Sequence, residues 1–321
     1  MILPRALAAW FSPAGTRASL SILIFHRVLR ASDPLAPDEP DASRFDEMLS
    51  WVAQTFRVLP LDTAIERLRD GTLPARALSI TFDDGYEDNV SVALPILVRN
   101  GMTATFFISS GFLDGGRMWN DTVIEAIRRS PLDALDLASI GLGNHSLASI
   151  ADRRSAIARV LPSVKYLPCK ERLATVDAIG RLARASLPGD LMMSTAQVRE
   201  LRAAGMQIGA HTRTHPILAK LDPAQAEAEI GGGKTDLEAI LDERVALFAY
   251  PNGKPARDYG AEHVRMVEAS GFDAAVSTST GVARASTDRF QLPRFTPWDR
   301  TQLRFGLRLV TNMRALARTA A

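Results

Sequence analysis

Residues 77–86 read Ala-Leu-Ser-Ile-Thr-Phe-Asp-Asp-Gly-Tyr, a short apolar segment that ends in two adjacent acids. The apolar and β-branched first half is typical of a buried strand. The apolar run 90–98 that follows predicts a helix. Asp83 and Asp84 are therefore expected where a strand gives way to a helix, the edge at which α/β enzymes place their chemistry. Because neighbouring carboxylates repel each other, such a pair is best tolerated beside a cation.

Strand and helix patterns alternate along the whole chain. Further strands are predicted at 20–25, 57–60, 103–108, 206–210, 245–249, 274–277 and 290–295. Helical patterns lie between them, and side chains suited to capping occur at Asp88–Asn89, at Thr63 with Glu66, and at Ser194 with Gln197. This alternation favours a mainly parallel sheet. We predict the α/β class, as a distorted (β/α) barrel of seven or eight strands, with an open doubly wound sheet as the alternative.

Length and composition describe an ordinary globular chain. It has 321 residues, 46% of them hydrophobic and 23% charged, which suits one large α/β domain over residues 1–321. A net charge of +2 gives no indication of nucleic-acid binding. The single Cys169 excludes an internal disulfide and says little about compartment. The N-terminus matches a signal peptide poorly and no apolar stretch is long enough for a membrane span, so we expect a cytoplasmic location. The pattern loosens between 110 and 190, where we predict an insertion.

A second polar cluster, His211-Thr212-Arg213-Thr214-His215, directly follows the strand predicted at 206–210. Two histidines four residues apart fall on one face of a helical turn and can bind one metal ion, usually zinc. Such a pair alone is often a surface feature. Because the carboxyl ends of parallel strands meet, we expect this pair to lie near Asp83 and Asp84. One Asp and two His would leave open positions for water and substrate.

Three segments resemble a known family. Thr-Phe-Asp-Asp-Gly at 81–85, His-Thr-x-x-His at 211–215 and Phe-Ala-Tyr-Pro-Asn-Gly at 248–253 are similar to the first three signatures of the polysaccharide deacetylases (NodB-homology, carbohydrate esterase family 4). Their order and spacing also agree, over residues 75–300 of this sequence. The resemblance implies a distorted (β/α) barrel that removes N-acetyl or O-acetyl groups from a carbohydrate polymer.

The resemblance also implies roles for individual residues. Asp83 would be the general base, while Asp84, His211 and His215 would hold a divalent metal, most often Zn²⁺, with Co²⁺ or Ni²⁺ as alternatives. A bound metal activates water and polarises the acetyl carbonyl, and a nearby base takes the water's proton. The backbone amide of Asn252 would stabilise the oxyanion.

Two positions depart from the family pattern. Ala249 stands where the third signature often carries an Arg that orients the base. The His that usually serves as general acid late in the chain has no counterpart after Gly253 in a matching context. Arg294 lies at the last predicted strand, and we predict that it is the partner of Asp83.

His26 offers a replacement for the missing acid. It ends the first predicted strand, so it is expected at the same edge of the sheet. Phe25-His26-Arg27-Val28 is similar to the Tyr-His-x-Val opening of the poly-N-acetylglucosamine deacetylase branch, in which an N-terminal His can act as the acid. We predict that His26 protonates the leaving amine. The alternative is a hydrogen-bonded structural histidine.

Aromatic and third-signature residues are candidates for substrate contact. Aromatic faces suit the apolar faces of pyranose rings, although core packing is an equal alternative for the tryptophans. The predicted substrate-binding residues are Tyr86, Trp119, Tyr250, Pro251, Asn252 and Trp298.

The last predicted helix, from about residue 299, has a basic and an apolar face. The expected faces are Arg300, Arg304 and Arg308 against Leu303, Leu307 and Val310. Peripheral contact with an anionic membrane is one interpretation, and a solvated outer face is the commoner one.

The sequence as a whole predicts a metal-dependent hydrolase that removes acetyl groups from N-acetylated sugars of a glycan. One alternative is a non-catalytic carbohydrate-binding protein on the same fold. Another is a hydrolase of the same fold that acts on a small cyclic amide or an O-acetyl ester.

Overall fold

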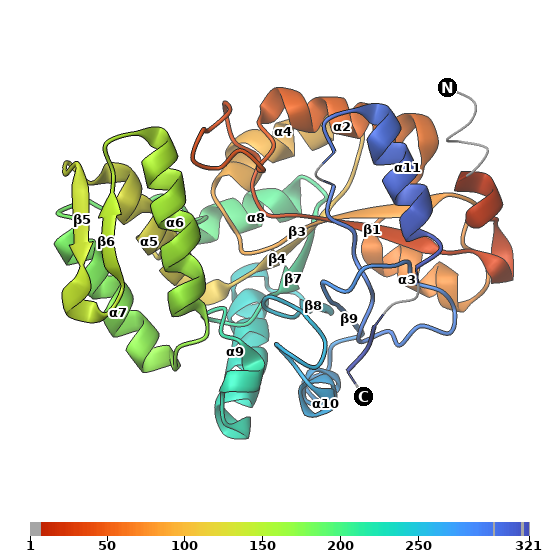
Figure 1. Ribbon diagram of the computed structural model, residues 1–321. Coiled ribbons are helices and arrows are strands. Elements are labelled where there is room, and N and C mark those ends of the chain that lie inside the picture. Colours follow the sequence, from red (N-terminus) through yellow and green to blue (C-terminus); the bar gives the residue numbers. More distant parts are fainter. Residues whose placement is uncertain (1–7, 298, 316–317, 321) are drawn as a thin grey trace.

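A computed structural model describes residues 8–297, 299–315 and 318–320, and it is built around one curled parallel sheet (Figure 1). The sheet has seven strands. Their order is β1 (Leu20–Phe25), β3 (Ala77–Phe82), β4 (Thr105–Ile108), β7 (Gln207–Ala210), β8 (Leu247–Ala249) and β9 (Ala274–Val276), with β2 (Arg57–Val58) also paired to β3. All these pairs are parallel. The predicted α/β class with a distorted, barrel-like sheet is confirmed.

The predicted strand at 290–295 is replaced by an irregular segment that touches both edges of the sheet. Leu292 bridges to Val276 of β9, and Phe295 bridges to Leu23 of β1. Pro293 lies between these contacts and has no N–H to donate, so a continuous ladder cannot form there. The segment nevertheless links β9 to β1 and carries Arg294 towards the carboxyl end of β3.

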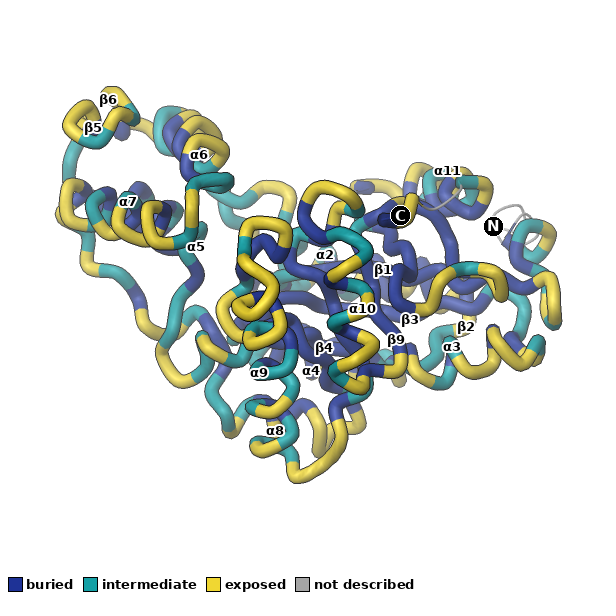
Figure 2. Tube along the Cα trace, turned by 90° about the horizontal axis from the view of Figure 1, so that it is seen from below, coloured by how far each residue is buried: buried dark blue, intermediate teal, exposed yellow. Residues whose placement is uncertain are grey.

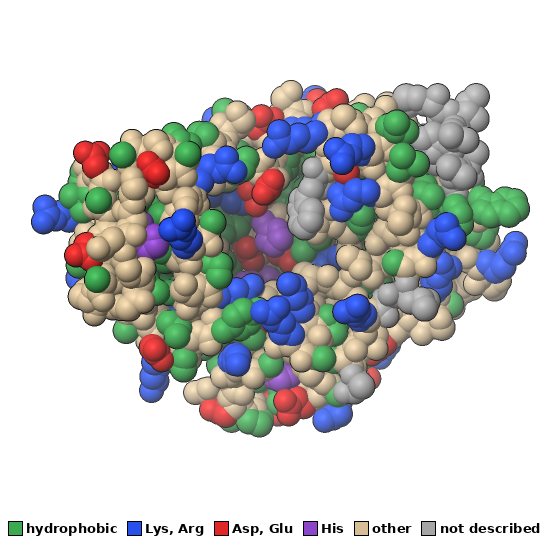
Figure 3. Space-filling model, in the orientation of Figure 1, with side chains coloured by type: hydrophobic (Ala, Val, Ile, Leu, Met, Phe, Trp, Pro, Cys, Tyr) green, Lys and Arg blue, Asp and Glu red, His purple; other side chains and the backbone are tan. Residues whose placement is uncertain are grey.

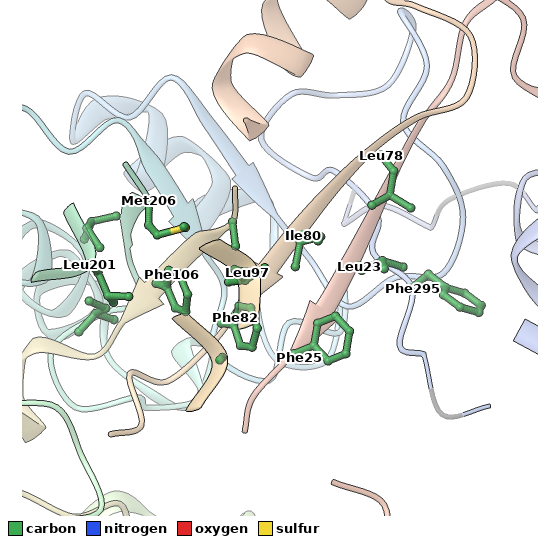
Figure 4. Close-up of a cluster of buried hydrophobic side chains, with 14 of the residues drawn as sticks. Leu23, Phe25, Leu78, Ile80, Phe82, Leu97, Phe106, Leu201, Met206 and Phe295 are labelled. Atoms are coloured by element: carbon green, nitrogen blue, oxygen red, sulfur yellow. The ribbon is translucent and has the colours of Figure 1, made fainter. Parts of the chain in front are cut away.

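The hydrophobic core follows from the alternation of side chains along the strands. On one face, Phe25, Phe82 and Phe106 lie side by side on β1, β3 and β4, with ring centroids 5.4 and 4.7 Å apart (Figure 4). On the other face, residues such as Ile22 and Phe107 belong to a second buried cluster. With both faces apolar, the strands are fixed in register and their carboxyl ends are left for function.

Helices cover the outside of the sheet. They are α2 (Ala42–Thr55), α3 (Leu61–Arg69), α4 (Leu94–Arg99), α8 (Thr195–Ala203), α9 (Pro223–Leu241), α10 (Ala261–Ala269) and α11 (Gln302–Asn312). The capping box of Ser194 with Gln197 is confirmed at the start of α8. The one predicted for Thr63 is wrong, because α3 begins at Leu61, directly after Pro60.

Asp88 and Asn89 do not cap the following helix, contrary to expectation. Asn89 begins a π-helical turn that runs to Ala93, and Asp88 caps nothing with its side chain. The Asp88 carboxylate instead accepts from the Arg27 side chain at 2.7 Å, and the Asn89 amide donates to the His26 carbonyl at 2.9 Å. Both residues therefore fix the loop that leaves β1.

The chain between residues 110 and 190 contains a separate lobe beside the barrel (Figures 1 and 2). Its elements are α5 (Trp119–Arg129), β5 (Ala134–Leu137), β6 (Gly143–Ser146), α6 (Ile150–Lys165) and α7 (Cys169–Leu182). The antiparallel hairpin β5–β6 was not predicted from the sequence. The lobe has a hydrophobic cluster of its own, which includes Ile127, Leu137, Val160 and Val176. It lies within the predicted insertion.

Helix α11 packs through a different face from the one expected. Phe305 and Leu309 are buried, whereas Leu303 and Leu307 are 64% and 52% exposed. Arg308 on the same helix is paired with Asp299 at 2.7 Å. Membrane contact through this helix stays a prediction. Among the described residues, every helix is too short or too polar to span a bilayer.

Candidate active site

The carboxyl ends of the parallel strands meet around a cleft of about 540 Å³. Asp83 and Asp84 follow β3, His211 follows β7, and His26 follows β1. Figure 3 shows the hollow, with acidic and histidine side chains on its floor and Lys or Arg side chains around its rim. Segments more than a hundred residues apart therefore supply a single site, as the edge-of-sheet argument predicts.

Arg294 holds Asp83 with two hydrogen bonds. Its Nη1 donates to Oδ1 at 2.6 Å and its Nη2 to Oδ2 at 2.7 Å, while Nε donates to the Ser277 carbonyl at 2.9 Å. Both side chains are almost fully buried. Burial alone would raise the pKa of Asp83, but the charge and hydrogen bonds of Arg294, together with the nearby His211, outweigh it and lower that pKa. Asp83 is thus an oriented carboxylate that stays ionised at neutral pH.

Asp84, His211 and His215 converge on one point. Asp84 Oδ1 lies 3.4 Å from Nε2 of each histidine, and the three ligand atoms are all within 4.8 Å of one another. This buried oxygen has no hydrogen-bond partner among the described residues. One carboxylate and two imidazoles are a ligand set that divalent transition metals, zinc above all, accept. The residues present therefore fit a metal site with open positions.

The protonation states of the two histidines suit this assignment. The Nδ1 of His211 lies 2.7 Å from the Ala249 carbonyl, which can only accept, so Nδ1 carries a proton and Nε2 faces Asp84. Burial lowers the pKa of His215 to about 4 and keeps it neutral. Burial also opposes protonation of His211, but Asp83 and Asp84 outweigh it and raise its pKa. Protons and metal therefore compete for His211.

The two histidines are presented by a loop, so the predicted helical turn is wrong. Thr212 and His215 have left-handed backbone conformations, with φ of +63° and +52°. Glu229 of α9 accepts the backbone N–H groups of Arg213 and Thr214 at 2.9 and 2.8 Å, which pins the turn. The two histidines, four residues apart, therefore converge because Glu229 of the neighbouring helix α9 fixes the loop between them.

Helix α9 can approach this loop because it carries glycine at the contact. A Cβ at Gly233 would lie 2.8 Å from the backbone carbonyl carbon of Thr212, whereas one at Gly231 would meet open space. Gly233 is therefore required for close approach to the histidine loop, and Gly231 is not.

His26 lines the cleft together with the two acids and the two histidines. Its charge influences the pKa of Asp83, Asp84 and His215, which places it in the same electrostatic environment. Glu39, in the loop before α2, is a neighbour that the sequence did not reveal. Burial raises the pKa of Glu39, and His26 offsets part of that effect.

The predicted substrate residues have three different outcomes. Trp119 and Asn252 line the cleft. Asn252 has a φ of +58°, and its N–H has no acceptor within the described part of the chain. Trp298 lies outside the described residues.

Tyr86, Tyr250 and Pro251 do not line the cleft, so their predicted substrate contacts are wrong. Tyr86 is buried with Met118 and Met192, and its hydroxyl donates to Asp121 at 3.1 Å. Tyr250 is fully buried and stacks on Tyr259 with ring centroids 3.8 Å apart.

Pro251 is buried as well. Tyr86 follows the first signature and Tyr250 and Pro251 belong to the third, yet all three side chains are buried.

Several residues of the cleft were not predicted from the sequence. They are Met118, Asn120, Leu161, Pro162, Lys165, Tyr166, Lys254, Arg257 and Thr278. Those from the lobe reach the cleft through tertiary packing, for which no local sequence signal exists. Lys254 and Arg257 follow the third signature closely, and that position alone could have indicated them.

Comparison with known proteins gives a consistent result. A family model described as polysaccharide deacetylase matches residues 70–148 and 163–275. YxkH of Bacillus subtilis (strain 168), provisionally named a polysaccharide deacetylase, is 21% identical over 279 residues, which are 86% of this chain and 71% of that protein.

Solved structures share the fold. The Streptococcus pyogenes deacetylase PplD, in complex with acetate, superimposes with a TM-score of 0.58 at 18% identity, covering 87% of this chain and 92% of that one. IcaB from Ammonifex degensii gives a TM-score of 0.58 at 18% identity, covering 95% and 99%. A de-N-acetylase from Aggregatibacter actinomycetemcomitans gives 0.56 at 16% identity, covering 86% and 94%. At these identities the likeness establishes the fold alone.

Proposed function

The chain belongs to the polysaccharide deacetylase family, and we propose that it is a metal-dependent hydrolase that removes acetyl groups from N-acetylated sugars of a polysaccharide or glycan. One observation carries this proposal. An ionised carboxylate, Asp83, is held beside but apart from a convergent triad of Asp84, His211 and His215. Asp83 and Asp84, although adjacent in the sequence, would therefore have separate roles, Asp83 as the base and Asp84 as a metal ligand.

The triad would hold the metal, with Zn²⁺ the best match to its ligands and Co²⁺ or Ni²⁺ as alternatives. When bound, a metal of this kind lowers the pKa of a coordinated water and polarises the acetyl carbonyl. The chain's own part is to fix the ligands. The Ala249 carbonyl orients His211, and Glu229 holds the loop between the two histidines.

Asp83 would act as the general base. Arg294 orients its carboxylate and keeps it ionised, so it can accept the proton of the water that attacks the acetyl carbon. A bond then forms between the water oxygen and that carbon. The developing oxyanion would accept a hydrogen bond from the Asn252 N–H, which the described structure leaves without an acceptor.

His26 would act as the general acid. The carbon–nitrogen bond breaks, and the leaving nitrogen takes a proton from His26 to become a free amine, while acetate is the second product. Asn89 fixes the backbone at His26 by donating to its carbonyl, and Asp88 anchors the adjoining Arg27. Trp119 lines the same cleft and would contact a sugar face.

The experiment is an assay of acetate and free amine released from N-acetylglucosamine oligomers. The protein is stripped with a chelator and then reloaded separately with Zn²⁺, Co²⁺ and Ni²⁺. We expect release that disappears with the metal and returns on reloading. A parallel assay with O-acetylated oligomers tests the ester alternative. Absence of acetate from both substrates, despite bound metal, would instead favour a carbohydrate-binding protein.

A further inference from the structure

Three cationic side chains stand on the wall of the cleft where the lobe meets the barrel. Lys165 ends helix α6 of the lobe, and Lys254 and Arg257 lie in the loop after β8. All three line the cleft that contains Asp83 and His211. We call Lys165, Lys254 and Arg257 the cationic wall. Within the described residues, none of their side chains forms a hydrogen bond or ion pair with a carboxylate.

The lobe and the barrel bring two of these charges to one aromatic ring. The Arg257 guanidinium lies 4.6 Å from the centre of the Tyr166 ring, and the Lys165 ammonium lies 5.7 Å from it. Tyr166 belongs to the lobe and Arg257 to the barrel, so the packing of the two parts holds like charges together. Like charges repel, so an anion bound beside them would be stabilised by both charges.

The protein supplies little compensation of its own. Asp258 favours the charged form of Lys165, but burial together with Lys254 and Arg257 outweighs it and lowers the Lys165 pKa. Asp83 and Asp84 are the only acids among the described residues that line the cleft. Asp83 is already paired with Arg294, and Asp84 belongs to the ligand triad. The net charge of the whole chain is only +2, so this excess of positive charge is local.

We propose that the cationic wall binds an anionic group, a phosphate or a carboxylate, that the substrate carries next to its acetylated sugar. The inference rests on the proposed function, because it places the glycan in the same cleft. Lys and Arg recognise both anions through charge-assisted hydrogen bonds. The substrate class is accordingly an acidic glycan, such as one with uronic acid residues or one with phosphorylated sugars.

The test compares three defined substrates. The first is a neutral N-acetylglucosamine trimer, the second an oligosaccharide that alternates N-acetylglucosamine with glucuronate, and the third an N-acetylglucosamine oligomer with a phosphomonoester. We expect the wild type to prefer at least one acidic substrate by on the order of tenfold in kcat/KM, mainly through a lower KM. Added salt should weaken this preference. The second and third substrates distinguish a carboxylate from a phosphate.

Variants of the cationic wall test whether it causes the preference for acidic substrates. Lys254→Gln with Arg257→Gln should bring kcat/KM for the acidic substrate down to the value for the neutral one, while the charge-preserving pair Lys254→Arg with Arg257→Lys should retain most of the preference. Arg154→Gln is the matched control, because Arg154 is an exposed cation on α6 that does not line the cleft. Equal wild-type kcat/KM for acidic and neutral substrates, or a preference that survives the double Gln variant, would overturn the proposal.

Failure of anion binding by the cationic wall can be distinguished from failure of the proposed deacetylase activity. Absence of acetate from all three substrates counts against deacetylation and leaves the wall to be tested by binding. Equilibrium dialysis of the same three oligosaccharides then decides. Tighter binding of an acidic oligosaccharide, lost in the double Gln variant, supports the wall, and equal binding of all three contradicts it.

Discussion

Arg294 and Asp83, 211 residues apart in the sequence, form a buried ion pair with two hydrogen bonds of 2.6 and 2.7 Å. Ala249, which stands where the third signature often carries an Arg, contributes its carbonyl to His211. Arg294 comes instead from the segment that links β9 to β1. The orientation of the Asp83 carboxylate thus depends on the closure of the sheet.

Substitutions of Arg294 and Asp83 should have strongly non-additive effects on the free energy of unfolding. Arg294→Ala leaves the Asp83 carboxylate buried without a partner, and we expect a loss of about 3–5 kcal/mol in the free energy of unfolding. In an Asp83→Asn background the same change should cost much less, since no charge is then stranded. Urea denaturation of the four proteins measures this double-mutant cycle. Equal losses in both backgrounds would show that the two residues act independently.

His26 should be required for turnover and not for metal binding. If it protonates the leaving amine, His26→Ala lowers kcat by about 10²–10⁴-fold while the metal content stays that of the wild type. Acetate release and elemental analysis measure the two quantities. His145→Ala on the lobe hairpin is the control and should leave both unchanged. Near-normal turnover in His26→Ala would assign that histidine a structural role.

Alanine substitutions at Gly233 and Gly231, two residues apart on α9, should have different effects on zinc affinity and on stability. Gly233→Ala forces a Cβ against Thr212, between the two histidine ligands, and we expect zinc affinity to fall by about 10–100-fold. Gly231→Ala meets open space and should stabilise the helix by up to about 1 kcal/mol with unchanged affinity. Chelator competition and thermal unfolding measure both effects. The same zinc affinity in both variants would contradict the close approach of α9.

The pH dependence of stability should reveal Asp121. Burial raises the pKa of this carboxyl to about 7, and Arg27 offsets only part of the effect. As pH rises above about 4, the unfolded chain ionises at Asp121 while the folded chain keeps its proton, so stability is lost up to about pH 7. Asp121→Asn removes this loss and keeps an acceptor for Tyr86.

Urea denaturation of the metal-free protein at pH 4.5 and 7.5 measures the difference. We expect the stability of Asp121→Asn relative to the wild type to rise by on the order of 2 kcal/mol between these pH values. Asp177→Asn, an exposed carboxyl on the same lobe, should show no such trend. A constant difference for Asp121→Asn would place its pKa near the ordinary value.

The sequence predicted those features that depend on local pattern. The first strand, at 20–25, has the predicted bounds because all six of its residues are buried. Asp83–Asp84 and His211 meet because they follow parallel strands directly, and strand ends share an edge, while His215 joins them through the loop that Glu229 pins. The position of Arg294 on the last strand-like segment was likewise enough to suggest its partner.

Features that depend on side-chain direction were not predictable in this way. Tyr86 follows the first signature and Tyr250 lies in the third, but both side chains are buried in the core, because beyond the end of a strand the alternation of side chains no longer applies. Asp88 resembles a helix cap, but its carboxylate forms an ion pair with Arg27 instead of capping the helix. Lys165 reaches the cleft only because the lobe packs beside the barrel.

The most direct test of the account separates the two adjacent acids. Metal content and acetate release from N-acetylglucosamine oligomers are measured for the wild type, Asp83→Asn and Asp84→Asn. We predict that Asp83→Asn keeps the metal and loses turnover by about 10²–10⁴-fold, whereas Asp84→Asn loses both metal and turnover. Wild-type turnover in Asp83→Asn, or equal loss of metal in the two variants, would contradict the division of the pair into a base and a ligand.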